Sequence, residues 1–180
     1  MKNIPLRNLI FALATILWCA VIFKFSAVPA TGSTETSHTV GRLICETFYA
    51  GFGDLAGEEQ DQIVSDIDLY VRKGAHLSEY ALLGILVFGA VLPCLTRREK
   101  DGVRRLKGYT ERPSLWKSGG LTVLVSALYA ASDELHQTFV EGRAGRWTDV
   151  LIDTSGAFIG VLLCLAVISI VYAVDKKKNN

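Results

Sequence analysis

Two stretches of the chain combine acidic, basic and imidazole side chains within apolar surroundings. One is RKGAHLSEYALLG, from Arg72 to Gly84, and the other is YAASDELHQTFVEGRAGRWTDVLIDTSGAFIG, from Tyr129 to Gly160. Histidine and carboxylate side chains can transfer protons or bind a metal ion. Arginine and lysine instead bind phosphate, and arginine does so with two parallel hydrogen bonds. These two stretches therefore carry the side chains needed for catalysis or for anion recognition.

Helical spacing groups these residues on shared faces, because residues three, four or seven apart lie on one side of a helix. Arg72, His76 and Glu79 form one such stripe, and Asp133 with Gln137 forms another. The candidate acids and bases are His76, Glu79, Asp133 and Glu134, and the candidate ligand-binding residues are Arg72, Lys73, Tyr80, Gln137, Arg143, Arg146, Asp149 and Asp153. His136 ranks below His76, because a single histidine near a helix end more often packs than binds.

The spacing alone does not decide between catalysis and binding. The chain contains no HExxH and no GxSxG, and no serine or cysteine lies beside a plausible base. Its cysteines show no zinc or disulfide spacing. The identity of any metal ion or cofactor is therefore left open.

The elements that position these residues are apolar runs long enough to cross a bilayer. The chain has 180 residues, half of them apolar, and a net charge of +1. A crossing needs about 20 mostly apolar residues. The sequence predicts one all-α membrane domain with four transmembrane helices, at Leu6 to Val28, Gly74 to Leu95, Gly119 to Phe139 and Val150 to Val174.

The positive charges predict the orientation, since short loops rich in lysine and arginine stay in the cytoplasm. The loop from Thr96 to Ser118 is strongly basic, and both tails also carry basic residues. The segment from Pro29 to Lys73 is mostly acidic, with Arg42 as its only basic residue before Arg72. We therefore expect a multi-pass protein of the plasma membrane with both termini in the cytoplasm and the acidic segment outside. The basic loop serves as an orientation signal, so no nucleic-acid partner is expected.

The first apolar run has an alternative interpretation as a cleaved signal peptide, because Lys2 and Arg7 precede it and small residues follow it. Its length favours retention as a membrane helix. In the outer segment, Val40, Leu43 and Ile44 recur at helical spacing, as do Ile63 and Ile67. Two short amphipathic helices are expected there, either at the membrane interface or over the mouth of the bundle. A solvated helical hairpin without a ligand is the alternative.

The predicted orientation places the polar tips of all four spans on the outer side of the membrane. Ionisable side chains within a membrane nearly always face the bundle interior or a wet cavity, since exposing one at the bilayer centre costs about 2.5 to 3.5 kcal/mol. We therefore expect these tips to share one chamber. The Gly156 to Gly160 spacing would let a neighbouring helix approach closely.

Three segments resemble the motifs of the VanZ-like family. They are FKFSAVPATGS from Phe23, RKGAHLSEYALLG from Arg72, and SDELHQTFVEGRAGRWTDVLIDTSGAFIG from Ser132. The resemblance covers nearly the whole chain. It implies a small bacterial protein of the cell envelope, linked to reduced susceptibility to the antibiotic teicoplanin. That lipidated glycopeptide binds cell-wall precursors at the outer leaflet. The resemblance implies no mechanism.

Three hypotheses for the polar residues follow. The first is recognition of a phosphate-bearing lipid, a lipid-linked cell-wall precursor or a lipoglycopeptide at the outer leaflet. The second is a membrane-embedded enzyme, with or without a metal ion, that acts on a lipid-linked phosphate. The third is a nearly neutral ion-pair network that only holds the helices together.

Overall fold

The computed structural model describes residues 6–92, 97–100, 103–106 and 112–178. Its elements are α1 (Leu6–Ser26), α2 (Ala30–Phe48), the 3-10 turn η1 (Phe52–Asp54), α3 (Gly57–Val91), β1 (Arg97–Lys100), β2 (Val103–Leu106), α4 (Arg112–Gln137) and α5 (Trp147–Lys178). The predicted helical architecture is confirmed. It is joined by one short antiparallel hairpin, in which Arg97 of β1 lies opposite Leu106 of β2.

Three helices are long and apolar enough to cross a membrane: α1, α3 and α5, the last over Trp147–Lys177. The helix α4 covers the third predicted span as far as Gln137 but falls outside this group among the described residues. Lys117, Gly119 and Gly120, together with serine and threonine residues, lower the apolar content of α4. The protein is therefore a helical, membrane-type protein with three candidate spanning helices.

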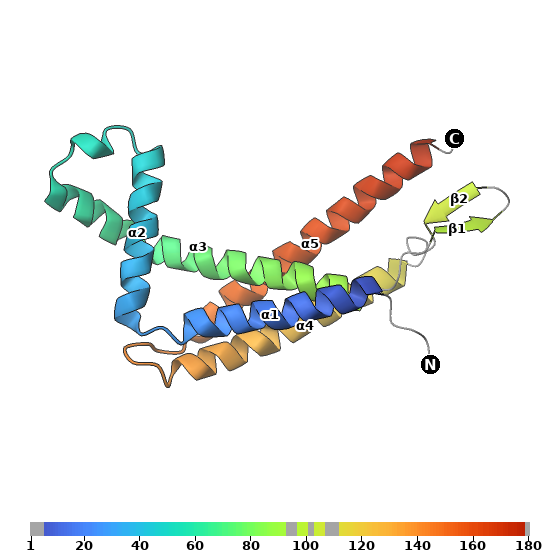
Figure 1. The fold of residues 1–180 in the computed structure, drawn as a ribbon, viewed down its shortest axis with the longest axis horizontal. Helices are drawn as coiled ribbons and strands as arrows, with labels where there is room; N and C mark the ends of the chain where they lie inside the picture. The colour runs from blue at the N-terminus through green and yellow to red at the C-terminus, as the bar shows by residue number, and fades with distance from the viewer. Residues whose placement is uncertain (1–5, 93–96, 101–102, 107–111, 179–180) are drawn as a thin grey trace.

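In the bundle, α3 contacts α1, α4 and α5 (Figure 1). The contact between α3 and α5 depends on glycine. A Cβ atom at Gly84 would collide with the Ala157 backbone, and one at Gly156 would collide with the Leu77 carbonyl oxygen. A Cβ atom at Gly160 would collide with the carbonyl oxygen of Ala81. The expected close approach at Gly156 and Gly160 is confirmed, and its partner is α3.

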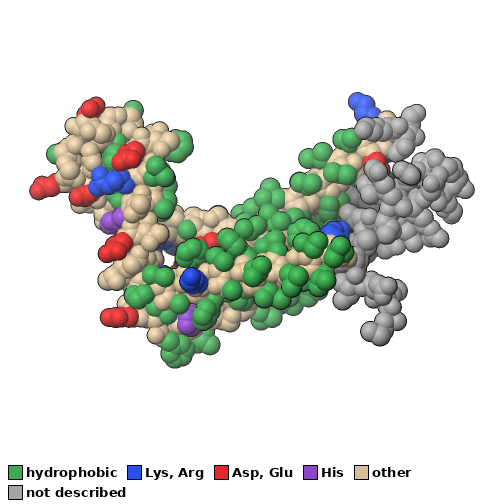
Figure 2. Space-filling view, viewed as in Figure 1, with side chains coloured by type: hydrophobic (Ala, Val, Ile, Leu, Met, Phe, Trp, Pro, Cys, Tyr) green, Lys and Arg blue, Asp and Glu red, His purple; other side chains and the backbone are tan. Residues whose placement is uncertain are grey.

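The bundle core is apolar, and so is most of its outer surface. Ile22, Tyr80, Leu83, Val87 and Ala130 form a buried cluster between α1, α3 and α4. Large apolar side chains also remain exposed along the bundle, including Leu9, Leu13 and Leu17 on α1, Leu124 and Leu128 on α4, and Leu163, Val167 and Ile170 on α5. Figure 2 shows this apolar surface along the length of the bundle. Such a surface suits lipid rather than water as the surrounding solvent.

Outside the bundle, α2 packs against the first part of α3 around a small core of Cys45, Phe52 and Val64. The helical stretch expected around Ile63 and the span expected from Gly74 prove to be one continuous helix. Gly74 does not interrupt it, since a glycine within a helix costs only about 1 kcal/mol. Residues 93–95 of the predicted second span, and the side chains of much of the basic loop, lie outside the described residues.

Candidate functional site

Polar side chains from α1 and α4 meet at one end of the bundle. The Ser26 hydroxyl at the end of α1 donates a hydrogen bond to Asp133 Oδ2 at 2.8 Å. The side-chain amide of Gln137 donates to Asp133 Oδ2 at 3.2 Å and to Glu134 Oε1 at 3.1 Å. Asp133, Glu134 and Gln137 are all buried. The last turn of α4 thus presents a hydrogen-bonded polar layer to the bundle interior.

The connection between α4 and α5 folds back over this layer. The backbone N–H of Arg146 donates to Glu134 Oε2 at 2.8 Å. A Cβ atom at Gly145 would collide with the Glu134 carbonyl oxygen, so only glycine permits this approach. Gly142 adopts a φ of 71°, in the left-handed region that favours glycine. The two glycines therefore let the connection bring Arg143 and Arg146 over the end of α4.

Arg143 binds the protein through three nitrogen atoms. Its Nε donates to the Val28 carbonyl at 2.8 Å, Nη2 donates to the Phe25 carbonyl at 3.3 Å, and Nη1 donates to Gln137 Oε1 at 3.2 Å. Burial, followed by the positive charge of Arg72, lowers the pKa of Arg143 below its usual value. The carbonyls at the end of a helix attract a cation. Arg143 therefore caps α1 and joins it to α4.

Beneath the connection, His76 of α3 faces Asp153 of α5. His76 Nδ1 lies 3.4 Å from Asp153 Oδ1, which is an ion-pair distance, and among the described residues neither atom has a hydrogen-bond partner. Asp153 is 0% exposed, whereas the His76 side chain keeps 27% of its surface accessible. Within the described part of the chain, no hydrogen-bond partner is found for either Asp153 carboxylate oxygen or for the buried Tyr80 hydroxyl. This layer therefore contains buried polar groups that could still form hydrogen bonds.

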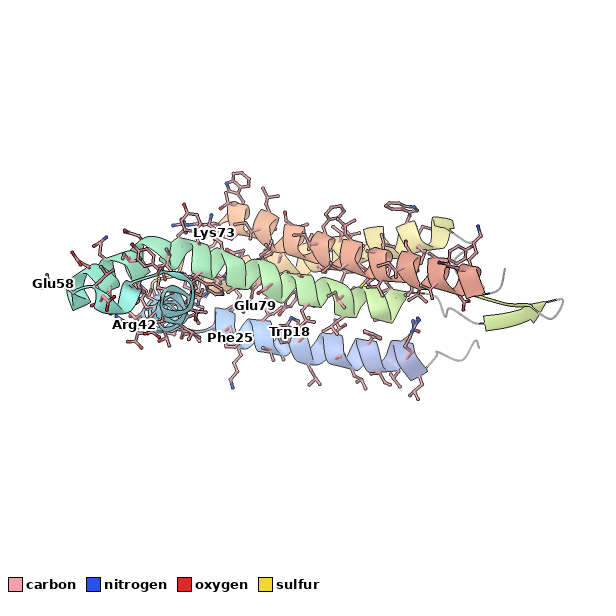
Figure 3. The ribbon with its side chains drawn as sticks, turned by 90° about the horizontal axis from the view of Figure 1, so that it is seen from above. Trp18, Phe25, Arg42, Glu58, Lys73 and Glu79 are labelled. Atoms are coloured by element: carbon pink, nitrogen blue, oxygen red, sulfur yellow. The ribbon has the colours of Figure 1, made fainter. Side chains whose placement is uncertain are left out.

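A cavity of about 260 Å³ lies above this layer. Its lining residues are Leu69, Arg72, Lys73, His76, Gln137, Arg143, Arg146, Asp149 and Ile152. The lining therefore holds four cationic side chains and one acidic side chain. Figure 3 shows Lys73 on α3 near the start of α5, and Glu79 on the side of α3 that faces α1.

The predicted site residues thus separate into two layers. Arg72, Lys73, His76, Gln137, Arg143, Arg146 and Asp149 line the cavity. Tyr80, Asp133, Glu134 and Asp153 are buried in the bundle and do not line it, and neither does the half-buried Glu79. His136 stacks on Phe23 with ring centroids 4.4 Å apart and lies outside the cavity lining. No group of three or more His, Cys, Asp or Glu side chains in the described residues is placed to hold a metal ion.

A comparison with protein-family models finds a match to VanZ/LLP1 over residues 11–170. The chain belongs to the VanZ/LLP1 family. No curated protein and no solved structure matches it. The matched range includes every residue that lines the cavity. The resemblance inferred from the sequence motifs is therefore confirmed.

Some parts of this VanZ/LLP1 site were not predicted from the sequence. Leu69 and Ile152 add apolar lining, and the carbonyls of Phe25 and Val28 hold Arg143. Trp18 Nε1 also donates to the Glu79 carbonyl at 2.9 Å, which ties α1 to α3 beside the site. Backbone carbonyls carry no sequence signal of their own, and helical periodicity describes one helix at a time. Helical periodicity therefore could not predict these particular contacts between residues of different helices.

Proposed function

We propose that α4 crosses the plasma membrane together with α1, α3 and α5, with both termini in the cytoplasm. The polar residues Ser118, Thr122 and Ser126 lower the apolar content of α4, yet all three are buried within the bundle. The outward face of α4 presents Leu121, Leu124, Val125 and Leu128. Lipid would therefore meet an apolar helix. The basic residues of the tails and of the loop before α4 support this orientation, in which the cavity opens at the outer leaflet.

At that leaflet, we propose that the protein binds the phosphate-bearing head group of a membrane lipid. The observation that carries this proposal is the cavity itself, with four cationic side chains and one acidic side chain at the end of an apolar bundle. A phosphate would add the negative charge that the lining lacks. Trp147 is 75% exposed at the start of α5, where an amphipathic ring suits the membrane interface.

The four cations differ in how far they are already engaged. Arg143 is held by three protein acceptors, and Arg72 lies 3.7 Å from Asp68. For the side chains of Lys73 and Arg146, the described part of the chain shows no ion pair. We therefore assign direct phosphate contact chiefly to Lys73 and Arg146. Arg143 is a positioning residue that keeps the connection over the cavity.

The test is lipid binding by the full chain in nanodiscs, with short-chain phosphatidic acid as the probe and inorganic phosphate as competitor. The double variant Lys73→Gln/Arg146→Gln should bind the probe at least about tenfold more weakly, since hydrogen bonds to charged groups are each worth about 1.5 to 3 kcal/mol. Lys24→Gln is the matched control, because Lys24 is an exposed cation at the end of α1 that does not line the cavity. Unchanged affinity in the double variant would contradict the proposal. Competition by inorganic phosphate would show that the acyl chains are not required.

Lipids with a phosphate-bearing head group include the lipid-linked precursors of the cell wall. Binding of such a precursor would explain how the protein could reduce susceptibility to teicoplanin. A protein that occupies such a precursor, or that binds a lipoglycopeptide beside it, would reduce the action of teicoplanin at the outer leaflet. Expression in a susceptible bacterium should then raise the inhibitory concentration of teicoplanin, and the Lys73→Gln/Arg146→Gln variant should remove that effect at equal protein level. If the variant still raises the inhibitory concentration of teicoplanin, resistance does not depend on the cationic residues of the cavity.

A membrane-embedded enzyme acting on a lipid-linked phosphate is the second candidate. The His76 and Asp153 contact below the cavity favours it, because a histidine oriented by a buried carboxylate can serve as a general base. The test is hydrolysis of a panel of lipid phosphates and pyrophosphates, with added divalent ions in a parallel series and His76→Gln as the comparison. Turnover that disappears in His76→Gln would support catalysis, and turnover equal to that of empty nanodiscs would exclude it for that panel.

A further inference from the structure

The helix α2 lies across the bundle rather than along it. In Figure 1 its axis runs at a steep angle to α1 and α3, and in Figure 3, seen from above, α2 is viewed nearly end-on. It begins at Ala30, directly after the short link that follows Ser26 of α1. Its 19 residues cover about 28 Å at 1.5 Å of rise each. If α1 spans the bilayer, α2 starts at the membrane surface and stays near it.

The side chains of α2 fall into three sectors. Ser37, Gly41 and Cys45 recur every four residues and are buried, with Gly41 next to Val64 and Ile67 of α3. A second sector is apolar and exposed, and it consists of Val40, Leu43, Ile44 and Phe48, the last 82% exposed. A third sector is charged and consists of Glu35, Arg42 and Glu46. The packing against α3 therefore leaves an apolar face of α2 uncovered.

This uncovered face has a definite direction. Figure 2 shows hydrophobic side chains along the side of α2 that faces the length of the bundle, whereas acidic side chains gather on the opposite side. The apolar side of α2 thus points along the spanning helices, toward the depth at which lipid would surround them.

We infer that α2 is a membrane-surface helix whose exposed apolar sector, Val40, Leu43, Ile44 and Phe48, inserts into the outer leaflet beside the bundle. The inference rests on the membrane orientation proposed above. Acyl chains are the occupant that fits, because the sector faces along the bundle while the charged sector faces away, as in helices that lie in a membrane interface. A soluble partner would have no reason to require that alignment.

The same helix is attached to both walls of the cavity. At its start, the backbone N–H of Ala30 donates to the Glu141 carbonyl at 3.1 Å, within the connection that carries Arg143. Near its middle, the Ser37 hydroxyl donates to Asp68, which lies 3.7 Å from Arg72. A helix anchored in the leaflet would therefore hold the cationic lining at the depth of lipid head groups. This gives α2 a role in the proposed lipid recognition without any contact between α2 and the phosphate.

Site-directed spin labelling in nanodiscs tests the inference. In a chain with Cys19, Cys45, Cys94 and Cys164 replaced by alanine, single cysteines are introduced as Ile44→Cys and Glu46→Cys and labelled with a nitroxide. The label at position 44 should collide more with oxygen than with a water-soluble nickel complex, and the label at position 46 should show the reverse. Water accessibility at both positions would overturn the inference. Protection of position 44 from both reagents would also overturn it, because protein and not lipid would then cover the face.

A second measurement avoids the cysteine replacements. Ile44→Trp and Glu46→Trp are prepared in the native chain, and quenching by brominated lipids is corrected for the native tryptophans by subtracting the unmodified protein. Stronger quenching at 44 than at 46 is expected, and equal quenching would overturn the inference. Phosphatidic acid binding is measured on the same samples. If phosphatidic acid binds normally while the tryptophan at position 44 is not quenched, only the role of α2 is rejected. If binding does not depend on Lys73 and Arg146, the proposed function is rejected.

Discussion

An arginine caps the carboxyl end of a neighbouring helix at each end of the bundle. Arg7 of α1 donates through Nη2 to the Leu92 carbonyl at the end of α3, at 2.6 Å, and Asn8 adds a bond of 2.6 Å to the Ala90 carbonyl. At the opposite end, Arg143 donates to the carbonyls of Phe25 and Val28. The same chemistry, a cation on terminal carbonyls, thus stabilises both ends.

The two ends of the bundle differ in their buried charged side chains. The buried charged side chains of the described residues are Asp133, Glu134 and Asp153, and all three belong to the end of the bundle where Arg143 lies. Burying such groups is costly, so a protein that needs only stability has no reason to collect them. The end with Arg7 shows that capping can be achieved without an acidic layer. The acidic layer therefore points to function at the other end.

Both ends depend on the contact between α3 and α5, so its disruption should have the largest effect. Gly156→Leu places a side chain against the Leu77 carbonyl and should lower the free energy of unfolding by more than about 3 kcal/mol, at or above the usual range for overpacking. Thermal unfolding in detergent, with loss of monodisperse protein, is the measurement. Gly120→Leu is the matched control, because a Cβ atom at Gly120 meets open space. Equal losses in the two variants would mean that the close approach is not what stabilises the bundle.

The next largest effect separates the two caps. Arg143→Gln and Arg7→Gln each remove charged hydrogen bonds to terminal carbonyls and should each lower the free energy of unfolding by about 2 kcal/mol. Only Arg143→Gln should also weaken the binding of phosphatidic acid, because only Arg143 lines the cavity. Binding and unfolding are measured on the same nanodisc samples. If Arg7→Gln weakens binding as much, the two ends are coupled and the proposed division of roles is wrong.

A third variant addresses the acidic layer itself. Glu134→Gln keeps the shape of the side chain but places an amide where Glu134 accepts from the Arg146 N–H and from Gln137. If the layer serves function, the variant should fold with a melting temperature within a few degrees of the native protein and should bind phosphatidic acid several-fold differently. Loss of folded protein in a fluorescence-detected chromatogram would support a structural network instead. The conservative Asp66→Asn on the exposed face of α3 is the control for a change in net charge alone.

Much of this arrangement was accessible from the sequence, because it follows from helical period and from the properties of lipid. The stripe of Arg72 and His76 and the glycine contact of α5 each depend on spacing within one helix, and the clustering of polar tips follows from the predicted orientation of the spans. The continuous α3 was not predicted, since the apolar run of the second span begins only after Arg72 and Lys73, and hydropathy does not show that the helix before this pair continues through it. The hydrogen bond from Arg143 to the Val28 carbonyl joins residues more than a hundred positions apart. It could not be predicted from the sequence either, because the acceptor is a backbone carbonyl.

The smallest expected effect compares two hydroxyl groups that tie α4 to α1. The Ser26 hydroxyl donates to buried Asp133 in the polar layer, and the Tyr129 hydroxyl donates to the Cys19 carbonyl at 2.7 Å, two helical turns from the end of α1. Ser26→Ala and Tyr129→Phe should each cost about 1 kcal/mol in unfolding. Ser26→Ala should in addition change phosphatidic acid affinity by about twofold, because Asp133 shares the Gln137 amide that faces Arg143. Titration of both variants beside the native protein measures this difference. If Tyr129→Phe shifts affinity as much as Ser26→Ala, the chain of hydrogen bonds from Ser26 to Arg143 does not set the cavity, and the distinction between the two ends reduces to packing.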